Sequence, residues 1–227
     1  MTEMSPVFPS DNPFRVRRVK PGAIPYQFVD PEIQQDDLVR RIITPDTGPK
    51  PTGPKLIVGP HGSGKTTLLH QLVPRIRQYW GTEIWVTLSS DLSPGENQNL
   101  LRRSMGKANH HRHRDPWLVI DGIEQLGRLN GWLLTRYLRR SGTRCLATSH
   151  RRILGWDHFF ATRLNSELIH RLCDQLLADA DSSLRKKVLN NLSSRDLHTT
   201  TDLRALWFEL YDLVADFETQ DRTAAVR

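Results

Sequence analysis

The chain has 227 residues, 37% of them hydrophobic, with a mean hydropathy of −0.51 and a net charge of +7. This length suits one core domain with an appendage, and apolar runs of no more than about five residues exclude a segment that spans a bilayer. The N-terminus lacks the charged and apolar regions of a signal peptide, and Cys145 and Cys173 give no disulfide framework. We therefore expect a cytoplasmic protein without a membrane segment.

Residues 1–54 are predicted to form an N-terminal arm and a proline-rich linker. The arm shows little periodicity, except that residues 31–43 are consistent with a short helix that has Asp30 as N-cap and Pro31 at its first position. Residues 44–54 contain four prolines and two glycines and are predicted to be a loop.

Residues 55–155 are predicted to form an α/β core. Short apolar runs alternate with helical patterns, which indicates a parallel sheet flanked by helices in three layers (αβα). The predicted strands are Lys55–Val58, Glu83–Leu88, Trp117–Ile120 and Thr143–Thr148. Pro74 is expected to kink or end the first core helix.

The helix after the third predicted strand has an apolar stripe and an end signal. Gly142 is the expected stop, with Arg139 and Arg140 in the last turn. The apolar positions expected to define its face are Leu126, Leu129, Leu133 and Tyr137.

Residues 156–218 are predicted to form a C-terminal helical lid, and residues 219–227 a frayed tail. Leucines recur every four residues from Leu164 to Leu176, a similar spacing runs from Leu184 to Leu192, and a last helix is expected over Thr201–Phe217.

The most specific motif is a complete G-x-x-x-x-G-K-[ST] phosphate-binding loop between a predicted strand and a predicted helix. Backbone N–H groups of such a loop and the helix N-terminus attract a polyphosphate, so the sequence predicts a bound nucleoside triphosphate. Lys65 is expected to contact the β- and γ-phosphates and act in catalysis, and Thr66 to bring its hydroxyl to Mg²⁺. The predicted nucleotide-binding residues are Gly59, Pro60, His61, Gly62, Ser63, Gly64, Lys65, Thr66 and Thr67.

Two further groups of polar residues follow predicted strands. Asp121 ends a buried strand, where a carboxylate can hold Mg²⁺ near the phosphates; the alternative is a turn residue before Gly122. Glu124 is the candidate that orients the attacking water, or else an acid favoured by the helix dipole. The sensor candidates at the γ-phosphate, or alternatively capping residues, are Thr148, Ser149 and His150.

These motifs resemble those of the P-loop ATPases with an extra strand between the two nucleotide motifs, above all the AAA+ proteins and the related STAND/NACHT ATPases. The resemblance covers residues 55–150 and implies ATP and Mg²⁺ as cofactors. The chain has Gln125 where the STAND pattern ends in an acid, and His150 where it has arginine, which implies slow hydrolysis.

The same resemblance implies a lid arginine that reaches the γ-phosphate and an apolar wall for adenine. Arg204 is the matching lid residue, with Arg195 and Arg185 as competitors. The wall is expected from residues upstream of the loop, namely Ile24, Tyr26 and Phe28. Absence of an Asn/Thr-Lys-x-Asp motif favours ATP over GTP.

Basic residues concentrate in residues 101–152, which carry a net charge of +9 against −2 for the rest of the chain. This concentration of positive charge has two interpretations. One is a site for nucleic acid that includes Arg112 and Arg114, and the other is a basic surface exposed to solvent. Arg151 or Arg152 is a candidate arginine finger in a homo-oligomer.

The resulting hypothesis is a slow Mg²⁺-dependent ATPase that couples nucleotide state to a change between core and lid. The alternatives are a nucleotide-gated regulator that binds DNA or a protein with little hydrolysis, and a small-molecule kinase.

Overall fold

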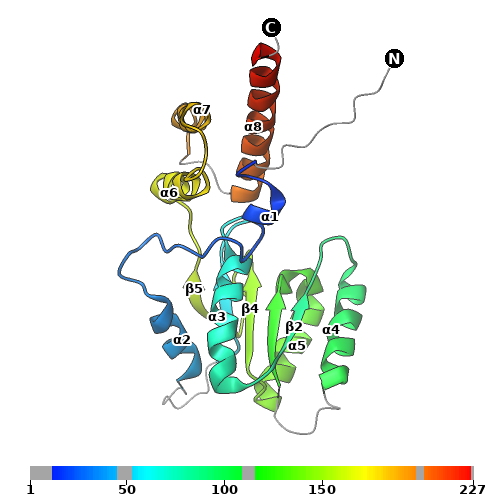
Figure 1. Cartoon of the computed structure of the whole chain (residues 1–227). Helices are drawn as coiled ribbons and strands as arrows, with labels where there is room; N and C mark the ends of the chain where they lie inside the picture. The colour runs from blue at the N-terminus through cyan, green and yellow to red at the C-terminus, as the bar shows by residue number, and fades with distance from the viewer. Residues whose placement is uncertain (1–11, 45–52, 109–115, 198–201, 226–227) are drawn as a thin grey trace, which may run out of the picture.

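The computed structural model describes residues 12–44, 53–108, 116–197 and 202–225. Its centre is a single sheet of five parallel strands in the order β2-β3-β4-β1-β5 (Figure 1). The strands are β1 (Lys55–Val58), β2 (Glu83–Thr87), β3 (Trp117–Asp121), β4 (Cys145–Ser149) and β5 (Asp157–Ala161). The predicted parallel α/β fold is therefore confirmed.

The central strands have side chains buried on both faces, as parallel sheets covered by helices require. Every residue of β4 is buried, and so are the first four residues of β3. The register pairs Val58 of β1 with Ser149 of β4, and Ile120 of β3 with Ala147 of β4. The carboxyl ends of these three strands therefore lie side by side at one edge.

Helices cover both faces of this sheet (Figure 1). The helices α2 (Gln35–Ile43) and α3 (Lys65–Trp80) pack on one face around Ile57 and Leu146. The other face carries α4 (Pro94–Ala108), the 3₁₀ helix η1 (Ile123–Leu126) and α5 (Gly127–Ser141), which pack around Leu118 and Ala147.

The last strand, β5, corrects a prediction. Residues from Trp156 onward were expected to be helical, but Asp157–Ala161 forms an edge strand parallel to β1. Only residues 150–156 connect β4 to β5. Parallel strands are usually joined by a dozen or more residues that include a helix, so this crossover is unusually short and contains no helix.

Two details of the helices differ from the sequence predictions, and a third agrees with them. The helix α2 begins at Gln35 with Gln34 as N-cap, while Asp30 accepts a bond from the N–H of Glu32 instead. Pro74 lies inside α3, which nevertheless continues to Trp80. Gly142 does end α5, with φ of 69°, as predicted.

The buried face of α5 is not the one that its leucine spacing indicated. The residues packed on the sheet include Leu134 and Leu138, together with Leu126 at the end of η1. The expected face residues Leu129, Leu133 and Tyr137 are exposed. The sequence carries apolar side chains on both sides of this helix, and its position over the sheet decides which side is buried.

The remaining helices form a second core above the carboxyl edge of the sheet (Figure 1). They are α6 (Ser166–Leu176), α7 (Ser182–Ser193) and α8 (Leu203–Ala225), with the short α1 (Val16–Val19) beside them. The helix α8 continues well beyond the predicted end at Phe217. Within the described ranges, no helix has the length and hydrophobicity needed to cross a membrane.

The N-terminal segment belongs to this second core. The ring of Phe14 is buried and stacks on Trp207 of α8, with 5.6 Å between ring centroids. Asn12 is fully buried, and its amide donates to the carbonyl of Tyr211 at 2.9 Å. This part of the arm is thus fixed against α8.

Candidate nucleotide-binding site

The phosphate-binding loop connects β1 to α3 at the carboxyl edge of the sheet. Gly62 and Gly64 have φ of 64° and 86°, a left-handed conformation that favours glycine, and Gly64 is the N-cap of α3. The N–H of Gly59 donates to the carbonyl of Ser149 at 3.1 Å, and a Cβ on Gly59 would clash with the hydroxyl of Thr162. The loop is therefore fixed to both neighbouring strands, β4 and β5.

Lys65 occupies the centre of the loop. Its ammonium donates to the carbonyls of Gly59 at 2.8 Å and Pro60 at 2.6 Å, and lies 3.1 Å from Nδ1 of His150. Burial lowers the pKa of Lys65 to about 8, although the carboxylates of Glu124, Asp121 and Asp202 oppose that shift. A buried cation bonded to neutral acceptors is well suited to exchange them for phosphate oxygens.

Asp121 lies at the end of β3, directly opposite Thr66. The Thr66 hydroxyl donates to Oδ2 of Asp121 at 2.8 Å, and the Thr148 hydroxyl donates to Oδ1 at 2.5 Å. Thr148 also accepts from the N–H of Gly122 at 2.9 Å. An adjacent hydroxyl and carboxylate form the oxygen-donor set that Mg²⁺ uses beside phosphates, so Thr66 and Asp121 fit the metal role predicted for them.

Glu124, in η1, is connected to Lys65 of the loop through the side chain of His150. Its Oε1 lies 2.9 Å from Nε2 of His150, whose ring also stacks on His61 with 3.4 Å between centroids. Burial and the nearby Lys65 ammonium lower the pKa of His150, so a neutral ring accepts from Lys65 at Nδ1 and donates to Glu124 from Nε2. The other carboxylate oxygen, Oε2, is buried and has no hydrogen-bond partner among the described residues.

The three sensor candidates therefore have different surroundings. Thr148 positions Asp121, and His150 bridges Lys65 and Glu124. Ser149 is fully buried, and its hydroxyl accepts from the N–H of Arg151 at 3.2 Å. The Ser149 hydroxyl is thus engaged by the backbone that follows β4.

Two site residues were not anticipated from the sequence. The hydroxyls of Ser63 and Thr162 are 2.6 Å apart, which ties the loop to the end of β5. Asp202 lies so close to Gly62 that a Cβ on this glycine would clash with its carboxylate. An acid two residues before Arg204 resembles a helix cap, and Asp202 does accept from the N–H of Arg204 at 2.8 Å.

The lid-arginine candidates are distinguished by their contacts. Arg185 pairs with Asp174 at 2.8 Å, and Arg195 pairs with Glu209. Arg204 is exposed at the first turn of α8, and its guanidinium has no ion-pair partner within the described ranges. Of the three, only Arg204 lies next to the residue that touches the phosphate loop.

Aromatic side chains line the loop on its upstream side. The ring of Tyr26 lies against Gly64, and it meets Phe28 edge-on at 5.1 Å and Phe160 at 6.4 Å. Burial raises the pKa of the Tyr26 hydroxyl. Ile24 instead packs with the helices of the second core. Of the three residues expected for the adenine wall, Tyr26 therefore lies beside the loop and Phe28 packs on Tyr26.

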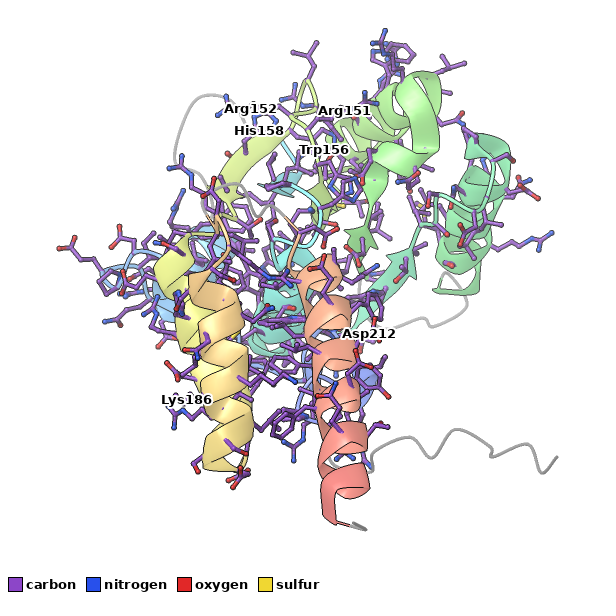
Figure 2. All side chains as sticks on the ribbon, turned by 90° about the horizontal axis from the view of Figure 1, so that it is seen from above. Arg151, Arg152, Trp156, His158, Lys186 and Asp212 are labelled. Carbon is purple, nitrogen blue, oxygen red and sulfur yellow. The ribbon has the colours of Figure 1, made fainter. Side chains whose placement is uncertain are left out.

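The remaining candidates lie in the crossover before β5 or outside the described residues. Arg112 and Arg114 lie in the segment 109–115, which the structure does not describe. Arg151 and Arg152 are exposed in the crossover before β5, on the opposite side of the view from Lys186 and Asp212 in Figure 2.

Comparison with known proteins identifies the fold. No family model and no curated protein sequence matches the chain. The solved structures it resembles include the Aeropyrum pernix Orc1 protein in complex with DNA, at a TM-score of 0.59 and 15% identity over 88% of this chain and 62% of that one. The replication initiator DnaA bound to AMPPCP and single-stranded DNA matches at a TM-score of 0.49 and 13% identity, over 87% of this chain and 70% of that one.

This chain thus spans about three fifths of the Orc1 protein it resembles. The match to Orc1 shows that this chain shares its αβα fold, which is the fold predicted for a P-loop ATPase of the AAA+ group. The narrower STAND/NACHT assignment remains a prediction.

Proposed function

We propose that the chain binds Mg-ATP at residues 59–67 and uses it to change the arrangement of core and helical lid. The observation that carries this proposal is the convergence of Lys65, Thr66 and Asp121 around a loop of the correct conformation at the carboxyl edge of the sheet. Open α/β sheets bind ligands at this edge. In the proposed complex, Lys65 leaves the carbonyls of Gly59 and Pro60 to contact the phosphates.

Mg²⁺, when bound, would neutralise phosphate charge and position the triphosphate. Thr66 supplies a hydroxyl ligand, and Asp121 holds the ion's water shell while Thr148 orients the carboxylate. Tyr26 and Phe28 provide an apolar wall for the base, in a position that suits adenine.

Glu124 is the proposed residue that orients the attacking water. Its unpartnered Oε2 supplies a free acceptor for that water. Oε2 is buried, however, and the contact of Oε1 with His150 holds the carboxylate in this position, so a water reaches Oε2 only when Glu124 turns or His150 moves. This requirement supports a slow ATPase.

Coupling to the lid is proposed to run through α8. Asp202 caps α8 and touches Gly62 of the loop. A bound triphosphate places negative charge close to this carboxylate, which favours displacement of the start of α8. Arg204, two residues after Asp202, then offers a cation to the γ-phosphate.

The direct test is to measure ATP turnover by the parent chain and by Glu124→Gln, after showing that the two proteins bind ATP equally well. The proposal expects slow release of phosphate from the parent, and at least about a 100-fold lower rate from the variant. Equal rates would contradict the role of Glu124. A Thr219→Ala variant, altered far along α8, is the matched control.

A second candidate function is a nucleotide-gated regulator that binds ATP without appreciable turnover. The contact of His150 with Oε1 of Glu124, together with the burial of Oε2, keeps this carboxylate away from a water and favours the second candidate. Under this alternative the Glu124→Gln and parent proteins bind ATP equally and neither releases phosphate, with or without DNA.

A further inference from the structure

The surface formed by α5 and the adjoining crossover is unusually apolar. Four large hydrophobic side chains of α5 are exposed: Leu129 at 70%, Trp132 at 55%, Leu133 at 41% and Tyr137 at 47%. In the crossover Leu154 is exposed at 95%, and the next residue, Gly155, lies against Thr135 of α5. We call these five residues the α5 stripe. Large exposed apolar side chains gathered along one helix and the segment beside it mark an interaction site.

The short crossover explains why the stripe is uncovered. Residues 150–156 pass from β4 to β5 without a helix, so no helix of the crossover packs beside α5 on this face. Trp156 fixes the crossover to α5 by donating from its indole N–H to the hydroxyl of Thr135 at 2.8 Å. The stripe is therefore held in place by a buried contact beneath it.

The charge around the stripe is entirely positive along α5. The helix has four arginines and no acidic residue. All four are exposed, and Arg136 lies over the ring of Trp132 at 5.6 Å. Arg151 and Arg152 extend the positive charge into the crossover. Two copies of α5 packed on each other would bring these arginines together, so the stripe does not suit a symmetric self-contact.

The side-chain types favour a protein over a nucleic acid. Three of the five stripe residues are leucines, which offer nothing for bases to stack on, and Arg136 already covers one face of Trp132. Spacings of three, four and eight residues along the stripe match the contact line of two packed helices. Tryptophan, tyrosine and arginine are the residues that dominate protein interfaces.

We propose that the α5 stripe is the docking surface for an acidic amphipathic helix of a partner protein. Leucines of the partner helix pack between Leu129, Trp132 and Leu133, and its flanking carboxylates pair with the arginines of α5. This inference goes beyond the proposed nucleotide function and does not depend on it, because the stripe lies outside the phosphate loop.

A designed peptide tests the proposal. The probe is a fluorescein-labelled helix about three heptads long, with Leu at two positions of each heptad, Glu beside them and Ala elsewhere. We expect it to bind the full chain, and Trp132→Ala to weaken binding by at least about tenfold. Arg136→Glu should weaken it as well, most strongly at low salt. Tyr79→Ala, which removes an equally exposed ring from α3, should leave binding unchanged.

Several results would overturn the proposal. One is no binding of the acidic peptide, and another is equal binding of the same peptide with Lys in place of Glu. A third is an oligothymidylate that displaces the peptide and loses affinity in Trp132→Ala, because the surface would then belong to nucleic acid. A fourth is dissociation of a homo-oligomer by Trp132→Ala in sedimentation. ATP affinity, measured in parallel, should be the same in all variants, which separates this proposal from the nucleotide site.

Discussion

Replacement of Phe14 by alanine should strongly destabilise the helical core. The Phe14 side chain is 2% exposed and stacks on Trp207. A buried aromatic side chain removes about 150–250 Å² from water, which at about 25 cal/mol per Å² corresponds to an upper bound of about 4–6 kcal/mol. Measured Phe→Ala changes in cores cost about 3–5 kcal/mol. We expect Phe14→Ala to lower the free energy of unfolding by that amount.

Urea denaturation followed by far-UV circular dichroism measures this loss. Val16→Ala is the matched control, because Val16 lies two residues further on and is 64% exposed; its effect should stay within about 0.5 kcal/mol. A double-mutant cycle of Phe14 and Trp207 should give a coupling of about 0.5–1.5 kcal/mol. A loss below about 1 kcal/mol for Phe14→Ala would refute the conclusion that this segment is packed against α8.

Three further changes have defined outcomes. Thr135→Val removes the acceptor of the buried Trp156 indole N–H, so thermal unfolding should show a loss of about 1–3 kcal/mol, and an unchanged transition would exclude that bond. ATP affinity should fall as pH rises through about 8, by at most about tenfold per unit, because the Lys65 ammonium loses its proton there; a flat profile from pH 7.5 to 9.5 in a fluorescent-ATP titration would contradict this. Gly59→Ala should cost about 1–3 kcal/mol in unfolding and reduce ATP affinity, since its Cβ clashes with Thr162; parent-like values would show that the loop is not held against β5.

The sequence predicted those features whose determinants are local. The phosphate loop, its strand and its helix follow from residues within one stretch, and the glycines at 62 and 64 adopt the positive φ that the motif implies. The end of α5 at Gly142 is likewise set by one residue. Asp121 could be placed at the same edge because parallel strands end there together.

Features that depend on distant contacts could not be predicted in this way. The strand β5 pairs with β1, which lies about a hundred residues earlier in the chain. It begins with the polar residues Asp157 and His158, so its sequence lacks the continuous apolar run that indicates a buried strand. Phe14 is buried by Trp207, near the other end of the chain. The bridge from Lys65 through His150 to Glu124 joins three separate elements, so the spacing of these residues carries no sign of it.

The most direct test of the central claim is the dissociation constant of Mg-ATP for the parent chain and for Lys65→Ala. The loop geometry predicts saturable binding by the parent and at least about tenfold weaker binding by the variant, since one charge-assisted contact to phosphate is lost. Tyr79→Ala, on the exposed surface of α3, should bind as the parent does. Equal affinity of the parent and Lys65→Ala, or no binding by the parent, would contradict a nucleotide site at residues 59–67.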